Sequence, residues 1–232
     1  MTFTLLARDP ERGLIGAATA SRSLAVGNAT IAIDPAVGAV ASQAWTNRAL
    51  RGRLLDALAA GDSAPAAVGR VPSWDGGSAL RQVSALPLDG PAAAWTGERA
   101  SAWAGELVDA DAVAVGNLLT GPEVLDALID EFGVLEDPVG PGDEAVGFAA
   151  RLVAALAAAD RAGGDRRGRQ SAAVQVARIG GERTFPPELD VDLRVDDHPD
   201  PLDELARLVE LRRAALLDPE TPRESAEGPA RS

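Results

Sequence analysis

The chain has 232 residues, of which 46% are hydrophobic and only 3% aromatic, and its formal net charge is −13. The absence of Cys and Lys and the presence of a single His exclude thiol nucleophiles, disulfides, iron–sulfur clusters, lysine Schiff bases and multi-histidine metal sites. The acidic balance argues against nucleic acid or an anionic membrane as a partner, and no run of about 18 apolar residues predicts a membrane span.

The first half of the chain is predicted to form four strands followed by two helices. Runs of β-prone residues separated by turn residues, such as Pro10 and Gly13, predict the strands. Leucines that recur on one face predict the longer helix, which Gly61 ends. We expect the strands at residues 2–8, 14–20, 31–33 and 37–42, and the helices at residues 47–60 and 63–68.

The second half is predicted to alternate between groups of strands and groups of helices. Asp89-Gly90 is a typical hairpin turn, and Pro122 suits the first position of a helix. We expect strands at 80–86, 92–96, 112–116, 172–178 and 190–195, helices at 123–132, 144–162 and 202–217, and a loop at 137–142. Residues 1–217 are expected to form one domain and the polar residues 218–232 a disordered tail. This clustering favours an α+β layered fold.

Thr2 offers more chemistry than any other residue of the chain. If Met1 is removed, Thr2 carries both a hydroxyl nucleophile and a free α-amine, and the amine can accept the hydroxyl proton during attack. An α-amine has a pKa of about 7.7–8.0, so near neutral pH it is a better base than any side chain here except His198. The alternative is an ordinary first-strand residue, since Thr also suits β-structure.

Six segments in order carry a resemblance to a known family. They are MTFTLLARDP (1–10), ASRSLAVG (20–27), SQAWTN (42–47), VGNLLTGP (115–122), GGDRRGRQSA (163–172) and DLRVDDHP (192–199). Together they resemble the domain-of-unknown-function family 1028, which is placed in the N-terminal-nucleophile (Ntn) hydrolase superfamily. The resemblance extends over about residues 1–217.

The resemblance implies an α+β fold with four layers in the order αββα, and Thr2 as a nucleophile at the end of the first strand. Backbone amides at Gln43 and Ala44 are expected to form the oxyanion hole. The wider superfamily cleaves amides, so the implied function is hydrolysis of a small amide or peptide-like substrate, with no metal or other cofactor. The implied catalytic positions are Thr2, Ser21, Gln43, Asn117 and Asp165.

Polar and basic positions are expected to bind the substrate. Family members often carry Lys where this chain has Arg22, and because Arg does not act as a base at ordinary pH, an electrostatic role is expected there. Arg169, with Arg166 and Arg167, could bind a substrate carboxylate or form a solvated loop. Trp45 could stack on a ligand or belong to the core. The implied substrate-binding positions are Arg22, Arg169, Gln170 and Ser171.

Two other functions are alternatives to the hydrolase. A binding or scaffold protein could retain the fold without activity, and fold alone does not choose between the two. A hydrolase based on His198 would need a Gly-x-Ser-x-Gly motif, which the chain lacks. The acidic neighbours of His198 resemble a metal site, but the prolines at 199 and 201 favour a helix-capping role.

The sequence also suggests a cellular location and an oligomeric state. The first residues lack a basic segment followed by an apolar one, so no signal peptide is expected and the predicted location is the cytoplasm. Small, Ala-rich helices would leave apolar outer faces, so a homo-oligomer is expected.

Overall fold

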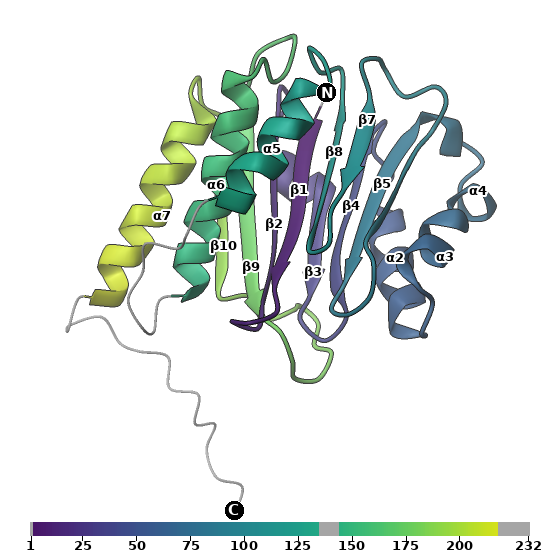
Figure 1. Ribbon diagram of the computed structural model, residues 1–232, viewed down its shortest axis with the longest axis horizontal. Helices are drawn as coiled ribbons and strands as arrows, with labels where there is room; N and C mark the ends of the chain where they lie inside the picture. Colours follow the sequence, from purple (N-terminus) through teal and green to yellow (C-terminus); the bar gives the residue numbers. More distant parts are fainter. Residues whose placement is uncertain (1, 135–143, 218–232) are drawn as a thin grey trace, which may run out of the picture.

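Two antiparallel β-sheets, stacked face to face, form the centre of the molecule in the computed structural model, which describes residues 2–134 and 144–217 (Figure 1). The larger sheet has the strand order β10-β9-β2-β1-β8-β7, and the smaller sheet has the order β3-β4-β5-β6. The strands of the larger sheet are β1 (Thr2–Asp9), β2 (Leu14–Ser21), β7 (Gly105–Val108), β8 (Ala112–Asn117), β9 (Ser171–Arg178) and β10 (Val191–Val195). Those of the smaller sheet are β3 (Ile31–Asp34), β4 (Gly38–Ala44), β5 (Arg81–Pro87) and β6 (Ala93–Thr96).

Helices cover the outer face of each sheet (Figure 1). The larger sheet carries α5 (Glu123–Val134), α6 (Glu144–Arg161) and α7 (Pro201–Leu217), and the smaller sheet carries α2 (Ala49–Ala59) and α3 (Ala64–Gly69). The remaining short elements are α1 (Val26–Thr30), α4 (Val71–Trp74) and the 3-10 turn η1 (Ser78–Leu80). None of the helices in the described part of the chain is long and apolar enough to cross a membrane.

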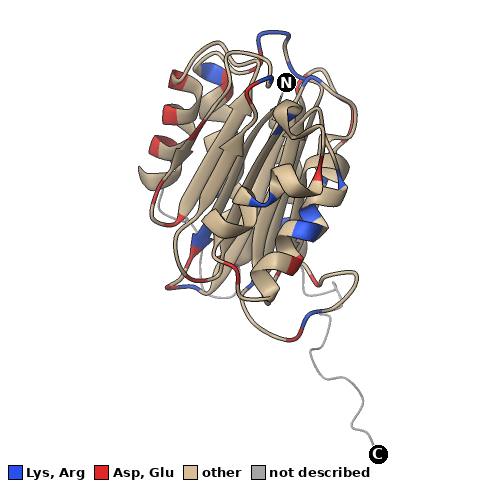
Figure 2. Cartoon of the chain, turned by 90° about the vertical axis from the view of Figure 1, so that its right-hand side faces the viewer, with Lys and Arg blue, Asp and Glu red and all other residues tan. Residues whose placement is uncertain are grey.

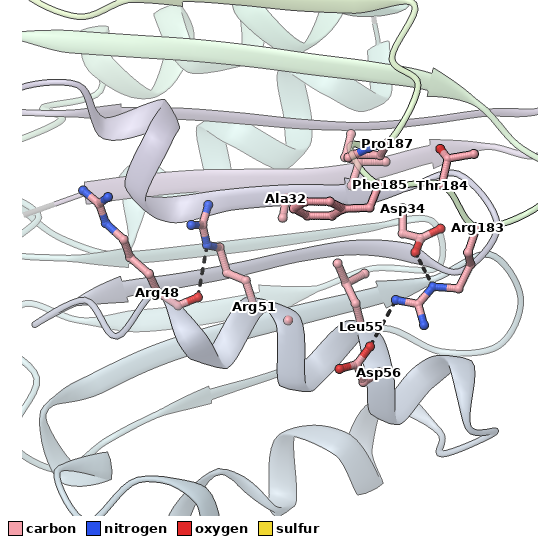
Figure 3. A pocket seen from close by; sticks show the side chains of 12 residues that line it. Ala32, Asp34, Arg48, Arg51, Leu55, Asp56, Arg183, Thr184, Phe185 and Pro187 are labelled. Carbon is pink, nitrogen blue, oxygen red and sulfur yellow. Dashed lines mark hydrogen bonds and ion pairs between the residues drawn. The ribbon is translucent and has the colours of Figure 1, made fainter.

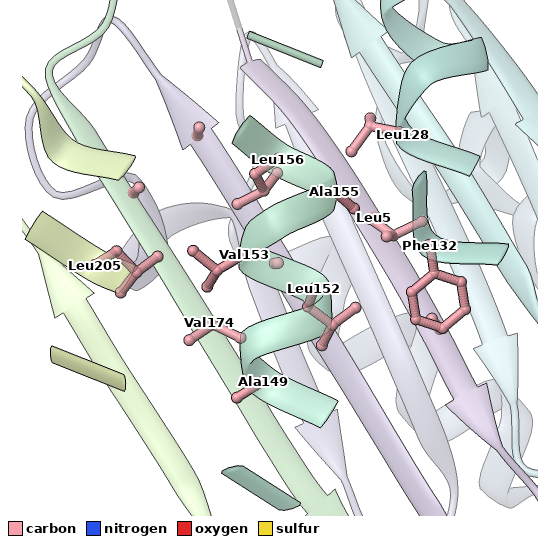
Figure 4. Packing of buried hydrophobic residues seen from close by; sticks show 14 of the residues in the cluster. Leu5, Leu128, Phe132, Ala149, Leu152, Val153, Ala155, Leu156, Val174 and Leu205 are labelled. Carbon is pink, nitrogen blue, oxygen red and sulfur yellow. The ribbon is translucent and has the colours of Figure 1, made fainter. Parts of the chain in front are cut away.

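Apolar side chains fill the space between successive layers in three clusters. The first joins α5–α7 to the larger sheet, where Leu152 and Val153 of α6 face Leu5 and Val174 of the strands (Figure 4). The second lies between the two sheets, and the third between the smaller sheet and its helices. Burial of this apolar surface is the main force that holds the layers together.

A glycine lets α6 approach β2 closely. A Cβ atom built on Gly16 would lie 2.5 Å from Leu152 Cδ1 and 2.9 Å from Phe148 Cε1. Phe148 in turn packs edge-to-face against Phe132 of α5, with ring centroids 5.8 Å apart. The small residues of β2 therefore reflect the close packing of a helix on its outer face.

The α+β class and all the predicted strands and helices are confirmed, with ends shifted by a few residues. Four short elements, α1, α4, η1 and β7, were not predicted because three to five residues give too little periodicity for a prediction. The predicted loop at 137–142 and the predicted tail at 218–232 lie outside the described residues.

Candidate active site

Thr2 begins the central strand of the larger sheet. Its register places it opposite Ser21 of β2 on one side and Asn117 of β8 on the other. The residue is only 7% exposed, and its Oγ1 donates a hydrogen bond to Ser21 Oγ at 3.2 Å. The hydroxyl is therefore buried and held by Ser21 rather than free at the surface.

Two amide side chains, one from each sheet, hold the backbone of Thr2. Gln43 Nε2 donates to the Thr2 carbonyl oxygen at 3.2 Å, and Asn117 Nδ2 donates to the same oxygen at 3.5 Å. Gln43 also accepts a hydrogen bond from Thr4 Oγ1 at 2.6 Å, through its Oε1. Thr4 Oγ1 also lies 2.8 Å from Thr19 Oγ1 of β2. Buried polar side chains therefore hydrogen-bond the start of β1 to a strand of each sheet.

Gln82 of β5 is the centre of this buried network, and sequence reasoning missed it. Its Oε1 accepts from Gln43 Nε2 at 2.8 Å and from Asn117 Nδ2 at 3.1 Å. Its Nε2 donates to Thr96 Oγ1 at 2.9 Å and to the Gly116 carbonyl at 2.8 Å. A fully buried Gln inside a predicted strand was the one available signal, since such a side chain needs partners.

A pocket of about 210 Å³ lies near the start of β1. One of its lining residues, Asn117, is the residue of β8 that pairs with Thr2. Two of its residues, Ala44 (φ 67°) and Leu118 (φ 55°), have left-handed backbone conformations that non-glycine residues rarely adopt. Such conformations concentrate at functional sites. The lining residues are Ser23, Ala44, Trp45, Ser101, Asn117, Leu118 and Arg167.

Ala44 is the last residue of β4 and lies opposite Arg81 of β5. The next residue, Trp45, donates its N–H to the Leu80 carbonyl at 3.2 Å. The left-handed φ of Ala44 interrupts the regular alternation of amides along the strand at this point. Of the two expected oxyanion donors, Ala44 is the one that lines the pocket.

Asp165 organises the loop beside Ser21. Its buried carboxylate accepts from the backbone N–H groups of Arg22 at 3.1 Å and Arg167 at 2.7 Å, and it pairs with the Arg167 guanidinium at 3.2 Å. No hydrogen bond joins Asp165 to Thr2 among the described residues. The carboxylate therefore lies one step away from the nucleophile position and supports the loop that flanks it.

The four expected substrate-binding residues divide between two roles. Arg22 Nη1 donates to Gln170 Oε1 at 2.9 Å, and Ser171 Oγ accepts from Val26 N–H at 3.0 Å and donates to the Ser23 carbonyl. These contacts place three of them around the end of β2.

The fourth, Arg169, is paired elsewhere. Its guanidinium forms ion pairs with Asp160 and, at 2.9 Å, with Asp200. The pKa of Arg169 is raised, mainly by the hydrogen bond to Asp200 and also by Asp160. Figure 2 shows that a basic loop lies at the end of the molecule where β1 begins. Of Arg167 and Arg169, only Arg167 lines the pocket.

His198 caps a helix, as the flanking prolines predicted. Its Nδ1 accepts a hydrogen bond from Asp200 N–H at 3.0 Å, directly before α7 begins at Pro201. In the described part of the chain, no group of three or more His, Cys, Asp or Glu side chains is placed to hold a metal ion.

Asp75 fixes the loop that carries Trp45. Its carboxylate accepts from Arg81 Nε, Asn47 Nδ2 and Gly77 N–H, each at 2.8 Å, and Arg81 also donates to the Trp45 carbonyl. These hydrogen bonds hold the pKa of Asp75 well below its usual value, and the hydrogen bond from Arg81 has the largest effect. Trp45 itself is 64% exposed at the mouth of the pocket.

Asp75→Asn is expected to lower the free energy of unfolding at neutral pH by about 1–3 kcal/mol, because it removes charge-assisted hydrogen bonds. Since folding lowers this pKa, the stabilising contribution is complete above the pKa of an unfolded Asp, near 3.9, and is lost as the pH falls below it. Urea unfolding of wild type and variant should show a stability difference that is constant above about pH 5 and shrinks below about pH 4. A difference that persists undiminished at about pH 2.5 would contradict this assignment.

Comparisons with known proteins support a family relationship. The chain matches the model of a family of unknown function, DUF1028, over residues 2–205. It is also similar to a Silicibacter pomeroyi protein, solved as a crystal structure and titled with the same family model. The sequence identity is 35% and the TM-score 0.77, over 90% of this chain and 88% of that chain. A search of curated proteins gave no match.

Proposed function

This chain belongs to the DUF1028 family, and we propose that it is an amidohydrolase of the Ntn type whose nucleophile is the hydroxyl of Thr2. The main support is the position of that hydroxyl at the start of the central strand, 3.2 Å from Ser21 Oγ. The strand neighbour of Thr2, Asn117, lines a pocket together with Ala44. A first-strand Thr with an ordinary structural role does not require two amide side chains on its own carbonyl.

The proposed reaction needs a free α-amine on Thr2, which removal of Met1 supplies. The amine takes the proton from Oγ1 as the oxygen attacks the amide carbon of the substrate, and returns it to the leaving nitrogen when the C–N bond breaks. This leaves an ester between the acyl group and Oγ1. Water then attacks the ester with the same amine as base, releasing a carboxylic acid and regenerating Thr2.

The surrounding groups have matching roles in this scheme. The Ala44 N–H is the proposed oxyanion donor, and loss of one such donor in other hydrolases costs about 3–4 kcal/mol of transition-state stabilisation. Gln43 and Asn117 fix the Thr2 carbonyl and hence the direction of the amine and the hydroxyl. Asp165 holds the loop after Ser21. A pocket of about 210 Å³ suits a small amide, with Trp45 as an apolar wall.

A chemical comparison tests the role of the amine. A β-lactone probe should acylate a form of the protein that begins at Thr2, and should not acylate a form extended by one bulky residue between Met1 and Thr2. The extended form keeps the hydroxyl but buries the Thr2 nitrogen in a peptide bond. Equal acylation of both forms would overturn the proposed mechanism, and acylation of neither would favour a binding protein on the same fold.

Ser21→Ala is expected to slow acylation of Thr2 by about tenfold, because it removes the hydrogen-bond partner that orients Oγ1. The rate of β-lactone labelling measures this effect. Ser23→Ala is the matched control, since Ser23 lines the same pocket but its hydroxyl makes no hydrogen bond with the described residues. Equal rates in the two variants would show that Ser21 does not orient the nucleophile.

A further inference from the structure

A second and larger cavity, of about 580 Å³, lies between α2, the edge strand β3 and the segment 183–187 (Figure 3). It shares no lining residue with the pocket beside Thr2. Its volume falls within the range typical of small-molecule sites, about 300–1,000 Å³. The proposed hydrolase reaction gives this cavity no role.

Two arginines at one end of the cavity have no carboxylate partner within the described residues. Arg51 Nη1 donates to the Ile31 carbonyl at 2.7 Å, and no ion pair is formed by either Arg48 or Arg51. At the opposite end, Arg183 is neutralised by Asp34 at 2.6 Å and by Asp56 at 3.1 Å (Figure 3). The end formed by Arg48 and Arg51 therefore carries an uncompensated positive charge in a strongly acidic protein.

The environment of Arg51 supports this description. Burial, followed by the positive charges of Arg48 and Arg194, lowers its pKa. An anion bound between the two guanidinium groups would relieve that repulsion and satisfy their unused donors, since charge-assisted pairs of this kind are among the strongest hydrogen bonds in proteins. A guanidinium fork also matches the planar geometry of a carboxylate.

Apolar groups form the remainder of the cavity wall. Phe185 is 99% exposed, although an aromatic ring gains substantially from burial. Pro187 lies on the same segment as Phe185, and Leu55 of α2 also lines the cavity (Figure 3). A ligand that carried an apolar body next to its anionic group would cover this ring.

We propose that the cavity binds a small organic anion, a carboxylate or phosphate attached to an apolar or aromatic body. The anionic group lies between Arg48 and Arg51, and the apolar body lies against Phe185, Leu55 and Pro187. The site recognises the anionic group and the apolar body together. A simple inorganic anion lacks the apolar body, and an uncharged aromatic compound lacks the anionic group. This site is separate from the one at Thr2 and does not depend on the hydrolase mechanism.

Isothermal titration calorimetry of the full chain tests the proposal by measuring its affinity for benzoate and for phenyl phosphate. Acetate, inorganic phosphate and benzyl alcohol are the comparison probes. Saturable binding is expected for benzoate or phenyl phosphate, and the tighter of the two identifies the anionic group. Each comparison probe should bind at least about tenfold more weakly. No saturable binding of either aromatic anion would overturn the proposal, as would equally tight binding of benzyl alcohol.

Arg48→Gln is the decisive variant, because Arg48 is exposed and makes no side-chain hydrogen bond with the described residues, so its loss leaves the fold intact. It should weaken binding by about tenfold or more. Arg53→Gln removes the same charge from α2, the helix that Arg48 directly precedes, but outside the cavity. It should change the affinity by less than about threefold, as should Thr2→Ala. Equal weakening by Arg48→Gln and Arg53→Gln would show that net charge, not this cavity, governs binding.

Discussion

Thr2→Ala is expected to abolish acylation by a β-lactone and hydrolysis of any amide substrate, with rates reduced by at least about 10³-fold. The hydroxyl is the atom that forms the acyl ester, and no neighbouring group can replace it: Ser21, the nearest hydroxyl, carries no α-amine. The fold should survive, because the substitution removes one hydrogen bond at the start of a strand that pairs on both sides. Labelling kinetics together with thermal unfolding measure both effects.

Thr2→Ser is the conservative partner of this variant. It keeps the hydroxyl and the amine and should retain labelling. A Thr2→Ala protein that still labels at the wild-type rate would remove Thr2 from the mechanism. Loss of labelling in both variants, with both folded, would show that the hydroxyl alone is not what the probe attacks.

Gln82→Leu is expected to lower the free energy of unfolding by about 2–4 kcal/mol. The variant leaves Gln43 and Asn117 without their shared acceptor and the Gly116 carbonyl without its side-chain donor, all in the buried space between the sheets. Unsatisfied buried polar groups carry their full desolvation cost. Because Gln43 and Asn117 also hold the Thr2 carbonyl, labelling of Thr2 should slow in the molecules that remain folded.

Gln175→Leu provides a matched control. Gln175 is also a buried glutamine in a strand, but its Oε1 has no partner and its Nε2 makes a single long contact, 3.4 Å, with Asp192. Its replacement should therefore cost less than about 1 kcal/mol and should not affect labelling. Urea unfolding that shows the same loss for both variants would mean that the Gln82 network does not stabilise the packing of the two sheets.

Local sequence patterns were sufficient to predict most of the secondary structure. The helix at 144–162 and the opening hairpin were clear because their apolar periodicity extends over many residues. The order of the strands in the sheets could not be predicted from such local patterns. β1 lies between β2 and β8, although about 90 residues separate the latter two, and this arrangement depends on tertiary packing.

The candidate site was predictable only where a residue type had a distinctive chemistry. Thr2 was identified by its position next to Met1. Ser21 and Asn117 were identified because they lie in segments that resemble the family. Gln82 gave no such signal, since its importance arises from the contact between two sheets. Likewise, several arginines occur close together in the loop at 163–172, and sequence could not reveal that Arg169 is held by Asp160 and Asp200.

The intact mass of the purified protein, before and after reaction with a β-lactone, tests the central claim most directly. The account predicts a mass that lacks Met1 and a single covalent adduct, located by peptide mapping on Thr2 and absent from Thr2→Ala. Retention of Met1, or a protein that begins at Thr2 but never forms the adduct, would contradict a nucleophilic role for Thr2 and indicate a binding function on this fold.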